Sequence, residues 1–453
     1  MSTAVAVRGV RGRTHSAVKL SPDRRLIQRQ LVAIDKRWCL SAEIERDPDW
    51  HELYVGPRGT PVPTKTHMSR SSWFRPPPVG VYLAFVGALN AALIVGRLEL
   101  HDSNPSAFAV IGSEFASASA VPAGYVVRSD TAADGQFYLR LALNPFTRAD
   151  YEYGIRLDNP PYRQQRILYP LFGWVLSVGN PSAAPIALIA VNYVSICVLA
   201  WIGARLAMSL GRSPGWGLFL PLYPGFVVSL ARDLTEPLAI CFVGTALLAL
   251  LSKRHVIASV LLCAAALTRE TTILVPVCFL IRSSLGIFGR FRAGPTTVYV
   301  FAIPLVVFGL WQAYLWRQWG ELPLVAGGQN LAAPLSGVLE FSHVLANLPS
   351  SLLAWLHLIE LASWALIATT VVLSLRAARV GSPLLLAWVG YSLQALVLSH
   401  AVWQSDWHAL RALVEWHLLS MLILMSVRSH LSMLPFIGML PVWVVTALQG
   451  VAD

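Results

Sequence analysis

The sequence predicts an all-α polytopic membrane protein: a transmembrane bundle of about eleven helices, with a long outer first loop that contains interfacial helices. Of the 453 residues, 55% are hydrophobic and only 13% are charged, whereas a soluble globular protein carries roughly a quarter charged residues. Apolar runs near the ~20 residues needed to cross a bilayer recur along most of the chain. These runs are continuously apolar rather than alternating, which argues against a membrane β-barrel.

Residues 1–78 form a basic segment before the first apolar run. This segment contains 14 Lys/Arg and 7 Asp/Glu, which is +7 of the net charge of +11. It has no apolar core, so it is not a signal peptide. We interpret it as a partly disordered cytoplasmic tail beside anionic lipid. Because most of the excess charge lies in this tail, the basic composition does not point to nucleic acid.

Residues 79–453 are predicted to form one transmembrane domain. The candidate spans are 79–97, 184–208, 215–231, 235–251, 256–268, 271–288, 296–316, 350–374, 384–402, 412–427 and 431–449. The span at 256–268 is short and is either tilted or half of a broken helix.

The positions of Lys and Arg in the short loops predict the orientation, because such residues favour the cytoplasmic side. With the N-terminus inside, the inner loops carry ten basic residues and no acidic residue. They are Arg205, Arg212, Lys253, Arg254, Arg282, Arg290, Arg292, Arg376, Arg379 and Arg428. Five polar clusters then emerge together on the outer face, where we expect a site. They are the outer loop 98–165, RDLTEP at 232–237, TRE at 268–270, the second outer loop 317–349 and SDWHALR at 405–411.

The five cysteines offer no redox or metal chemistry in this pattern. Four lie in apolar segments, one lies in the tail, and no CxxC spacing occurs. We therefore expect neither disulfides nor a cysteine metal site.

The first outer loop ends in NPPYRQQRILYPLFGWVL, residues 159–176. Arg163 and Arg166 are three residues apart and share one face if the segment is helical. The run 166–178 is amphipathic and too short to span, which predicts an interfacial helix. Two arginines there suit a lipid phosphate, and the alternative is that they extend to ordinary headgroups.

Two turns between apolar runs place arginine next to an acid. RDLTEP contains Arg232, Asp233 and Glu236, and ALTRETT contains Arg269 and Glu270. Glu236 suits the first turn of a helix, but a helix cap does not explain Arg232. Ionisable residues at the ends of membrane helices are costly unless paired or functional. Arg–Glu pairing across the two turns is one interpretation, and a cationic pocket for a phosphate or pyrophosphate is the other.

A third cluster, SDWHALRALVEW, adds Asp406, His408 and Arg411. Arg411 lies between two tryptophans at the expected membrane surface. It is either an interface anchor or a further phosphate contact.

Asp134 lies in AADGQFYLRLALNP, residues 132–145 of the first outer loop. A carboxylate can deprotonate a hydroxyl as that hydroxyl attacks, and nearby arginines can stabilise a leaving phosphate. The alternative is a solvated loop carboxylate. On composition alone, Asp130, Asp150 and Asp158 in the same loop are equal candidates.

The motifs DGQFY, YRQQRILYP, RDLTEP and TRE, in this order, resemble the GT-C superfamily of integral membrane glycosyltransferases. The nearest likeness is to bacterial proteins of cell-surface glycopolymer formation. A more distant one is to polyprenol-dependent mannosyltransferases of glycolipid and GPI-anchor assembly. The resemblance covers most of residues 80–430, and the N-terminal tail has no counterpart in it.

The resemblance implies inverting transfer of a hexose or pentose at the outer face of the plasma (inner) membrane. The sugar leaves a polyprenyl-phosphate donor and passes to a hydroxyl of an envelope glycolipid or glycopolymer. Asp134 matches the first-loop acid that acts as general base in the superfamily. Many members have two adjacent acids there, whereas this chain has Gly135, and Asp130 can serve as a second acid only if the loop folds back.

The predicted site combines these residues. Asp134 is the base, and the expected donor-phosphate contacts are Arg163, Arg166, Arg232, Arg269 and Arg411. The expected supporting residues are Glu236, Glu270, Tyr138 and Gln136. No cofactor or metal is expected, since the donor is a lipid-phosphate sugar and no acid cluster suits a metal. The partners are the donor, the glycan or glycolipid acceptor and the bilayer, without nucleic acid; the oligomeric state stays open.

Two other functions compete with this interpretation. A lipid-linked sugar flippase or transporter would predict polar residues at the bilayer midplane and internal repeats, which the sequence scarcely offers. A non-catalytic subunit of an envelope-assembly complex is the second alternative.

Overall fold

The structure is a computed structural model that describes residues 77–129, 132–285, 295–347, 352–378, 382–403, 406–427 and 429–452. Almost all of the predicted cytoplasmic tail, residues 1–78, lies outside the described residues. The same is true of Asp130, one of the alternative acids.

Long apolar helices dominate the described part, as the composition predicts. Five of them are long and apolar enough to cross a membrane: α3 (Val79–Leu100), α7 (Ala184–Ser209), Val298–Trp319 within α12 (Pro295–Trp319), Trp355–Ser374 within α15 (Leu352–Ser374) and Leu431–Ala452. The last combines the 3-10 helix η7 (His430–Gly438) with α20 (Met439–Ala452). The prediction of an all-α protein is confirmed, and the length and apolar composition of these five helices support a membrane-embedded protein.

The predicted count of eleven spans is not confirmed, because several predicted spans are shorter or broken helices. The shorter apolar helices are α6 (Leu168–Ser177), α9 (Glu236–Leu251), α10 (His255–Thr268), α16 (Ser382–Leu396) and α19 (Val414–Ser426). The predicted span 215–231 is divided into η4 (Pro214–Phe219) and α8 (Pro224–Ala231). Proline has no N–H and suits the first turn of a helix, so a new helix starts at Pro224.

Other predicted spans are interrupted in the same way. Span 271–288 consists of η5 (Glu270–Ile273) followed by α11 (Leu274–Leu285). Span 384–402 includes α16 and the separate short helix α17 (His400–Trp403), and α18 (Asp406–Ala412) precedes α19. Each interruption leaves backbone groups outside the regular helical pattern. Site arginines lie close to such helix ends: Arg269 lies between α10 and η5, and Arg411 lies in α18.

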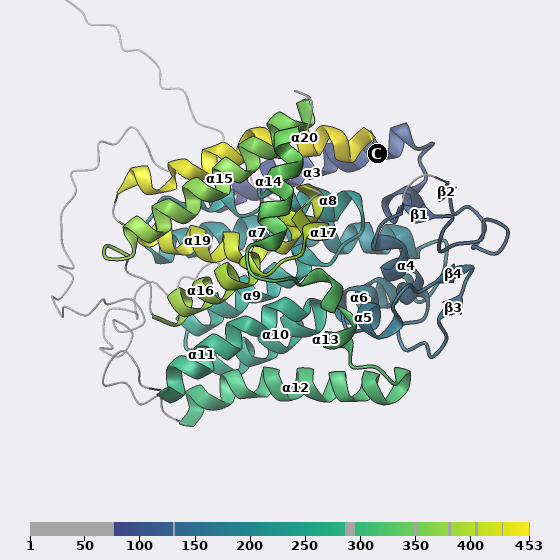
Figure 1. Cartoon of the computed structure of the whole chain (residues 1–453), viewed down its shortest axis with the longest axis horizontal. Coiled ribbons are helices and arrows are strands. Elements are labelled where there is room, and N and C mark those ends of the chain that lie inside the picture. The colour runs from purple at the N-terminus through teal and green to yellow at the C-terminus, as the bar shows by residue number, and fades with distance from the viewer. Residues whose placement is uncertain are drawn as a thin grey trace, which may run out of the picture. The chain divides into compact units, whose positions relative to one another are not determined.

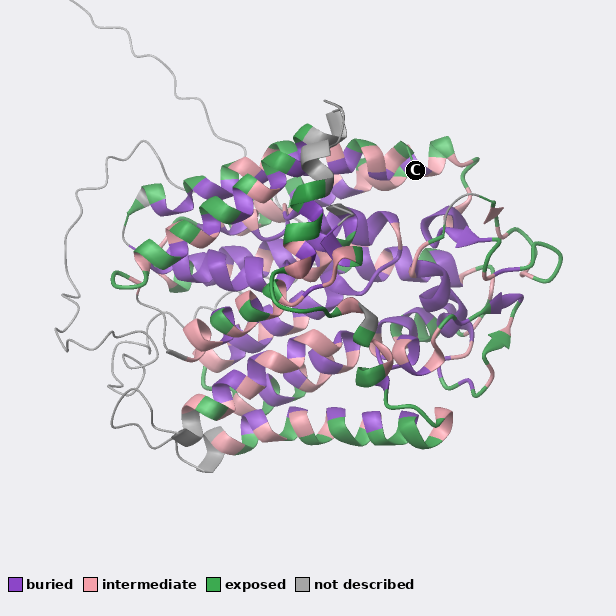
Figure 2. Cartoon of the chain, in the orientation of Figure 1, coloured by how far each residue is buried: buried purple, intermediate pink, exposed green. Residues whose placement is uncertain are grey.

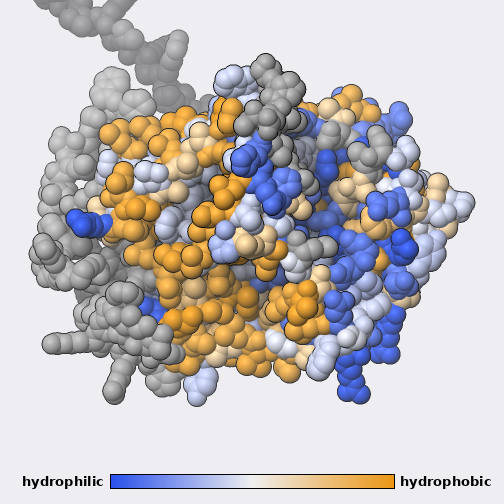
Figure 3. Space-filling view, in the orientation of Figure 1, coloured by the Kyte–Doolittle hydropathy of each residue, from blue (hydrophilic) through white to orange (hydrophobic). Residues whose placement is uncertain are grey.

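The surface is divided between an apolar and a polar region. Exposed apolar side chains follow one side of α12, including Val306, Leu310 and Trp316 (Figure 2). In Figure 3 hydrophobic residues cover much of the helical body, and hydrophilic residues gather at the end where Figure 1 places β1 to β4. Contiguous exposed apolar surface of this kind is expected where helices contact lipid. Within the most apolar 18 residues of each helix, 61% of α7 but only 17% of α3 is buried. Helix α7 is therefore central and α3 peripheral.

The first loop folds into its own small structure at the polar end (Figure 1). It contains η3 (Pro105–Phe108), the parallel pair β1 (Ile111–Gly112) and β2 (Val127–Arg128), and α4 (Gly135–Leu143). The antiparallel pair β3 (Tyr151–Glu152) and β4 (Ile155–Arg156), then α5 (Pro160–Gln164), lead to α6. Arg140 of α4 is fully buried and donates to the Ala149 carbonyl at 2.5 Å. The loop is therefore a packed platform that holds α4 in place.

The second predicted outer loop, 317–349, lies against this platform. It contains α13 (Pro323–Ala326), η6 (Gly328–Asn330) and α14 (Ser336–Asn347). At the end of α12, Trp319 donates to the Gln164 side chain at 2.7 Å, and Gln318 donates to the Thr147 carbonyl at 2.7 Å. Residues far apart in the sequence therefore meet around α5.

Candidate active site

Asp134 lies immediately before α4, yet its carboxylate caps no helix N–H group. Instead, its Oδ1 lies 2.9 Å from Nη1 of Arg163, and its Oδ2 accepts from Nη2 of Arg411 at 2.9 Å. A quarter of the Asp134 side chain is exposed. The carboxylate is thus clamped between two guanidinium groups, one from α5 of the first loop and one from α18. This arrangement differs from the solvated loop carboxylate that composition alone left open.

Gly135 explains why no second acid follows Asp134. A Cβ atom at this position would lie 2.1 Å from the carbonyl oxygen of Arg232 and 3.0 Å from that of Ala109. Both neighbours are backbone atoms, which cannot turn aside as the end of a side chain can. The α4 backbone therefore packs directly on the α8–α9 turn, and a side chain at position 135 is excluded.

Arg163 is held by two carboxylates at once. Besides Asp134, it contacts Asp158 through Nε at 2.8 Å and Nη2 at 2.6 Å. Its guanidinium lies 4.5 Å from the centre of the Phe137 ring, within the range of a cation–π contact. Asp158, one of the alternative acids, is thereby part of the site as an arginine partner.

Arg166 has different partners from Arg163. Its Nε and Nη2 atoms bind Glu270 bidentately at 2.7 and 2.5 Å, Nη1 donates to the Tyr138 hydroxyl at 2.9 Å, and Nη2 donates to the Tyr162 hydroxyl at 2.9 Å. Because α5 ends at Gln164, the helical spacing that would place both arginines on one face does not reach Arg166. Most of its N–H groups are occupied, so Arg166 joins the first loop to η5.

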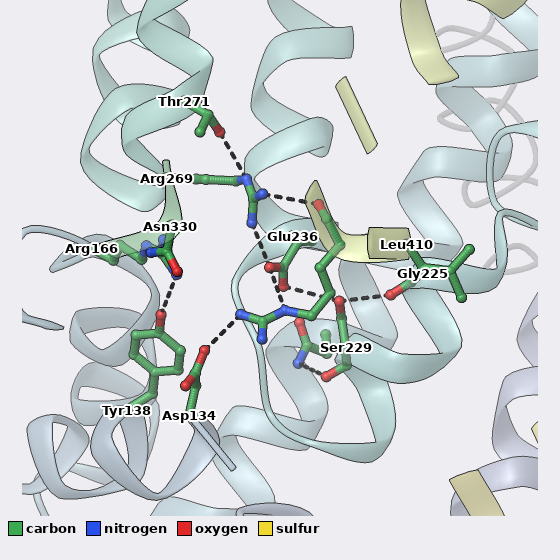
Figure 4. Close-up of polar contacts among 12 residues, drawn as sticks. Asp134, Tyr138, Arg166, Gly225, Ser229, Glu236, Arg269, Thr271, Asn330 and Leu410 are labelled. Atoms are coloured by element: carbon green, nitrogen blue, oxygen red, sulfur yellow. Dashed lines mark hydrogen bonds and ion pairs between the residues drawn. The ribbon is translucent and has the colours of Figure 1, made fainter. Parts of the chain in front are cut away.

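Glu236, at the start of α9, is the most deeply buried acid of the network, with no exposed surface. Its Oε1 accepts from Nη1 of Arg269 at 2.5 Å and from Nε of Arg411 at 2.9 Å, and its Oε2 accepts from Ser229 Oγ at 3.0 Å (Figure 4). The Arg–Glu pairing across the two turns is therefore present. Through Arg411, Glu236 is also connected to Asp134.

Glu415 is a site residue that the sequence patterns did not single out. It is buried in α19, and its Oε1 accepts from Nε of Arg269 at 2.9 Å and from the Thr271 hydroxyl at 2.6 Å. Arg269 also donates to the backbone carbonyl of Arg411 at 2.9 Å. The available signal was a lone acid within an apolar helix, four residues after Arg411, because such acids are rarely retained without a partner.

Arg232 and Gln136 occupy supporting positions. The Arg232 guanidinium lies 3.9 Å from the centre of the Trp407 ring, while its backbone carbonyl packs on Gly135. Gln136 is buried and accepts a hydrogen bond from the Gly112 N–H at 3.2 Å, which joins α4 to β1. Both residues position Asp134 through the backbone of α4.

The charges in the network nearly balance, which differs from the expected cationic pocket. The four arginines are Arg163, Arg166, Arg269 and Arg411, and the five acids they contact are Asp134, Asp158, Glu236, Glu270 and Glu415. Burial favours this balance, since a buried charge without a partner is costly. An anionic ligand must therefore compete with a carboxylate for its arginine.

The ionisation of Asp134 follows from its neighbours. Burial alone would raise its pKa, but the charges of Arg163, Arg411 and Arg166 outweigh burial and hold the pKa of this carboxyl well below its usual value. Asp134 is therefore an ionised carboxylate at neutral pH. It can accept a proton readily only after the arginines have moved away from it.

Among the described residues, no group of three or more His, Cys, Asp or Glu side chains is placed to hold a metal ion. The donors that the site offers to a ligand are guanidinium and hydroxyl groups, which suit an anion. No protein-family model and no curated protein matches this chain. Its function must therefore be inferred from the chemistry of these side chains.

Proposed function

We propose that the protein is an integral membrane glycosyltransferase of GT-C type. It transfers a sugar from a polyprenyl-phosphate donor to a hydroxyl of an envelope glycolipid or glycopolymer. One observation carries the proposal: Asp134, a partly exposed carboxylate at the polar end of the helical body, is held by two arginines. A base and groups that bind phosphate are thus adjacent.

The reaction is a direct displacement at the anomeric carbon. Asp134 takes the proton of the acceptor hydroxyl as its oxygen bonds to that carbon. The bond between the carbon and the donor phosphate oxygen breaks, and the leaving polyprenyl phosphate keeps the electron pair. Arg163 and Arg411 stabilise the charge that develops on the phosphate.

Binding of the donor would also raise the pKa of Asp134. When Arg163 and Arg411 turn from Asp134 to the phosphate oxygens, the carboxylate loses two of the three positive charges that lower its pKa. Asp134 becomes more basic only when a donor is in place. The buried contacts of Arg269 and Arg166 with glutamates suit an orienting role for these two arginines.

A transfer assay with two kinds of donor tests the function. Membranes that contain the protein should transfer radiolabel from polyprenyl-phosphate sugars to envelope glycolipid or glycopolymer. They should not transfer it from the same sugars supplied as nucleotide diphosphates, and membranes that lack the protein give the background. Failure to transfer from every lipid-phosphate sugar, or transfer from the nucleotide form, would contradict the proposal.

The proposed orientation places the site on the outer face of the plasma (inner) membrane and the N-terminus in the cytoplasm. Ala118 in the first loop and Ser252 after α9 are both exposed. In a chain without its native cysteines, we expect Ala118→Cys to react with an impermeant maleimide added outside intact cells. Ser252→Cys should react only after permeabilisation. Labelling of both positions from the same side would refute this topology.

A further inference from the structure

Among the described residues, no group accepts a hydrogen bond from the Tyr162 hydroxyl. We propose that Tyr162 is a ligand-binding residue that donates this hydrogen bond to a phosphate oxygen of the lipid donor. Arg166 and Asn330 position the hydroxyl for that purpose. The inference rests on the proposed function and assigns Tyr162 to the donor phosphate.

The argument begins with the hydrogen bonds at the Tyr162 oxygen. A hydroxyl has one donor and two acceptor sites. Both acceptor sites are filled, because Arg166 Nη2 donates to the oxygen at 2.9 Å and Asn330 Nδ2 donates to it at 3.2 Å. The O–H bond must therefore point away from both groups. No acceptor for it lies within the part of the chain that the structure describes.

The phenol ring is held firmly by both outer loops. The Asn159 side chain caps α5 by accepting from the Tyr162 N–H at 3.2 Å. From the second outer loop, Gly327 packs so closely that a Cβ atom there would lie 2.6 Å from the ring. Figure 4 shows Asn330 of the same loop beside Arg166. The hydroxyl is therefore preorganised, which lowers the entropic cost of binding a ligand.

The groups around the Tyr162 hydroxyl indicate which kind of acceptor it would bind. Two N–H donors polarise the Tyr162 hydroxyl and strengthen it as a donor. The guanidinium groups of Arg163 and Arg166 lie 5.3 and 5.1 Å from the ring centre. Anionic oxygens form stronger hydrogen bonds than neutral ones, so a phosphate oxygen fits this position. Arg163 also contacts Asp134, so a phosphate group bound to Tyr162 would lie close to one arginine of the clamp.

Binding to the full-length protein in nanodiscs tests the inference, with undecaprenyl phosphate and inorganic phosphate as separate probes. Tyr162→Phe removes only the hydroxyl, and we expect it to weaken binding of undecaprenyl phosphate about 10- to 100-fold. The matched control is Tyr125→Phe, because the Tyr125 hydroxyl already donates to the Pro181 carbonyl at 2.8 Å. This control should bind undecaprenyl phosphate as the wild type does.

Variants of Asn330 test whether binding depends on the direction of the Tyr162 O–H bond. Asn330→Ala removes one of the two groups that position the hydroxyl but leaves the Tyr162 proton in place, so it should weaken binding less than Tyr162→Phe does. Asn330→Asp offers an acceptor that draws this proton inward, so it should weaken binding as much as Tyr162→Phe. In the Tyr162→Phe background, Asn330→Asp should then add little. A further large loss would show that the new charge, not the hydroxyl, is responsible, and would overturn the inference.

The possible results separate the two proposals. A wild-type protein that does not bind undecaprenyl phosphate would contradict the proposed function and the inference together. Binding by the wild type that Tyr162→Phe leaves unchanged would overturn only the role of Tyr162. Loss of inorganic phosphate binding in Tyr162→Phe would assign the contact to the phosphate alone. Loss confined to undecaprenyl phosphate would assign it to the lipid-linked form.

Discussion

Asp134→Asn should reduce sugar transfer by about a hundredfold to ten-thousandfold, the range typical of losing a positioned general base. The amide has nearly the shape of the carboxylate but cannot take the acceptor proton. It also removes the negative charge between Arg163 and Arg411, each 2.9 Å away. Transfer from radiolabelled polyprenyl-phosphate sugars, normalised to the amount of folded protein in the membrane, measures the effect.

Asp158→Asn is the matched control for this prediction. Asp158 pairs with the same Arg163, and the side chains of both acids are 25% exposed. It lacks the second arginine that Asp134 has, and we assign it no proton transfer. We expect Asp158→Asn to retain most of the transfer rate. If Asp134→Asn transferred sugar at the wild-type rate, Asp134 would not be the general base. If both variants lost the same share of the rate, the loss would come from the missing pairing with Arg163.

The membrane class could be predicted from the sequence because it depends on composition and on the length of apolar runs. The number of spans could not. Hydropathy does not register a backbone break inside an apolar run, such as the one before Pro224 that separates η4 from α8. The break at Arg269 was visible because a charge marks it, and α10 indeed ends there.

The site was only partly predictable for a related reason. Arg411 and Asp134 are 277 positions apart, and only tertiary packing brings them together. Glu415 was missed because the apolar pattern of α19 explained its neighbours without it. The charge balance could not be predicted either. The sequence suggests the arginines as phosphate ligands, but it does not show which carboxylates pair with each buried guanidinium group.

Gly135 shows how a departure from the pattern of the proposed family acquires a physical reason. The sequence has a glycine where many members of that family have a second acid. In the structure, the backbone of the α8–α9 turn occupies the space that any side chain would need. Glu236 is instead connected to Asp134 through Arg411 rather than along the chain.

Glu236→Ala should lower the free energy of unfolding by about 3–5 kcal/mol, the usual cost of removing one partner from a buried ion pair. Glu236 has no exposed surface and accepts hydrogen bonds from Arg269, Arg411 and Ser229. Without it, the two guanidinium groups share a buried site with one carboxylate fewer between them. Unfolding of the purified protein in mixed micelles, followed by the loss of helical signal, measures the change.

The control for this prediction is Glu152→Ala. Glu152 also pairs with an arginine, the buried Arg140, but at 3.4 Å and with 31% of its own side chain exposed. Removing it should therefore cost less than removing Glu236, which is fully buried and has two arginine partners. Combining Glu236→Ala with Arg269→Ala should cost less than the sum of the two single changes, because the double variant no longer leaves Arg269 without Glu236. A Glu236→Ala protein as stable as Glu152→Ala would mean that the buried network contributes little to the fold. Glu236 would then have to be retained for the orientation of Arg411 alone, and Glu236→Ala would reduce transfer in a protein of normal stability.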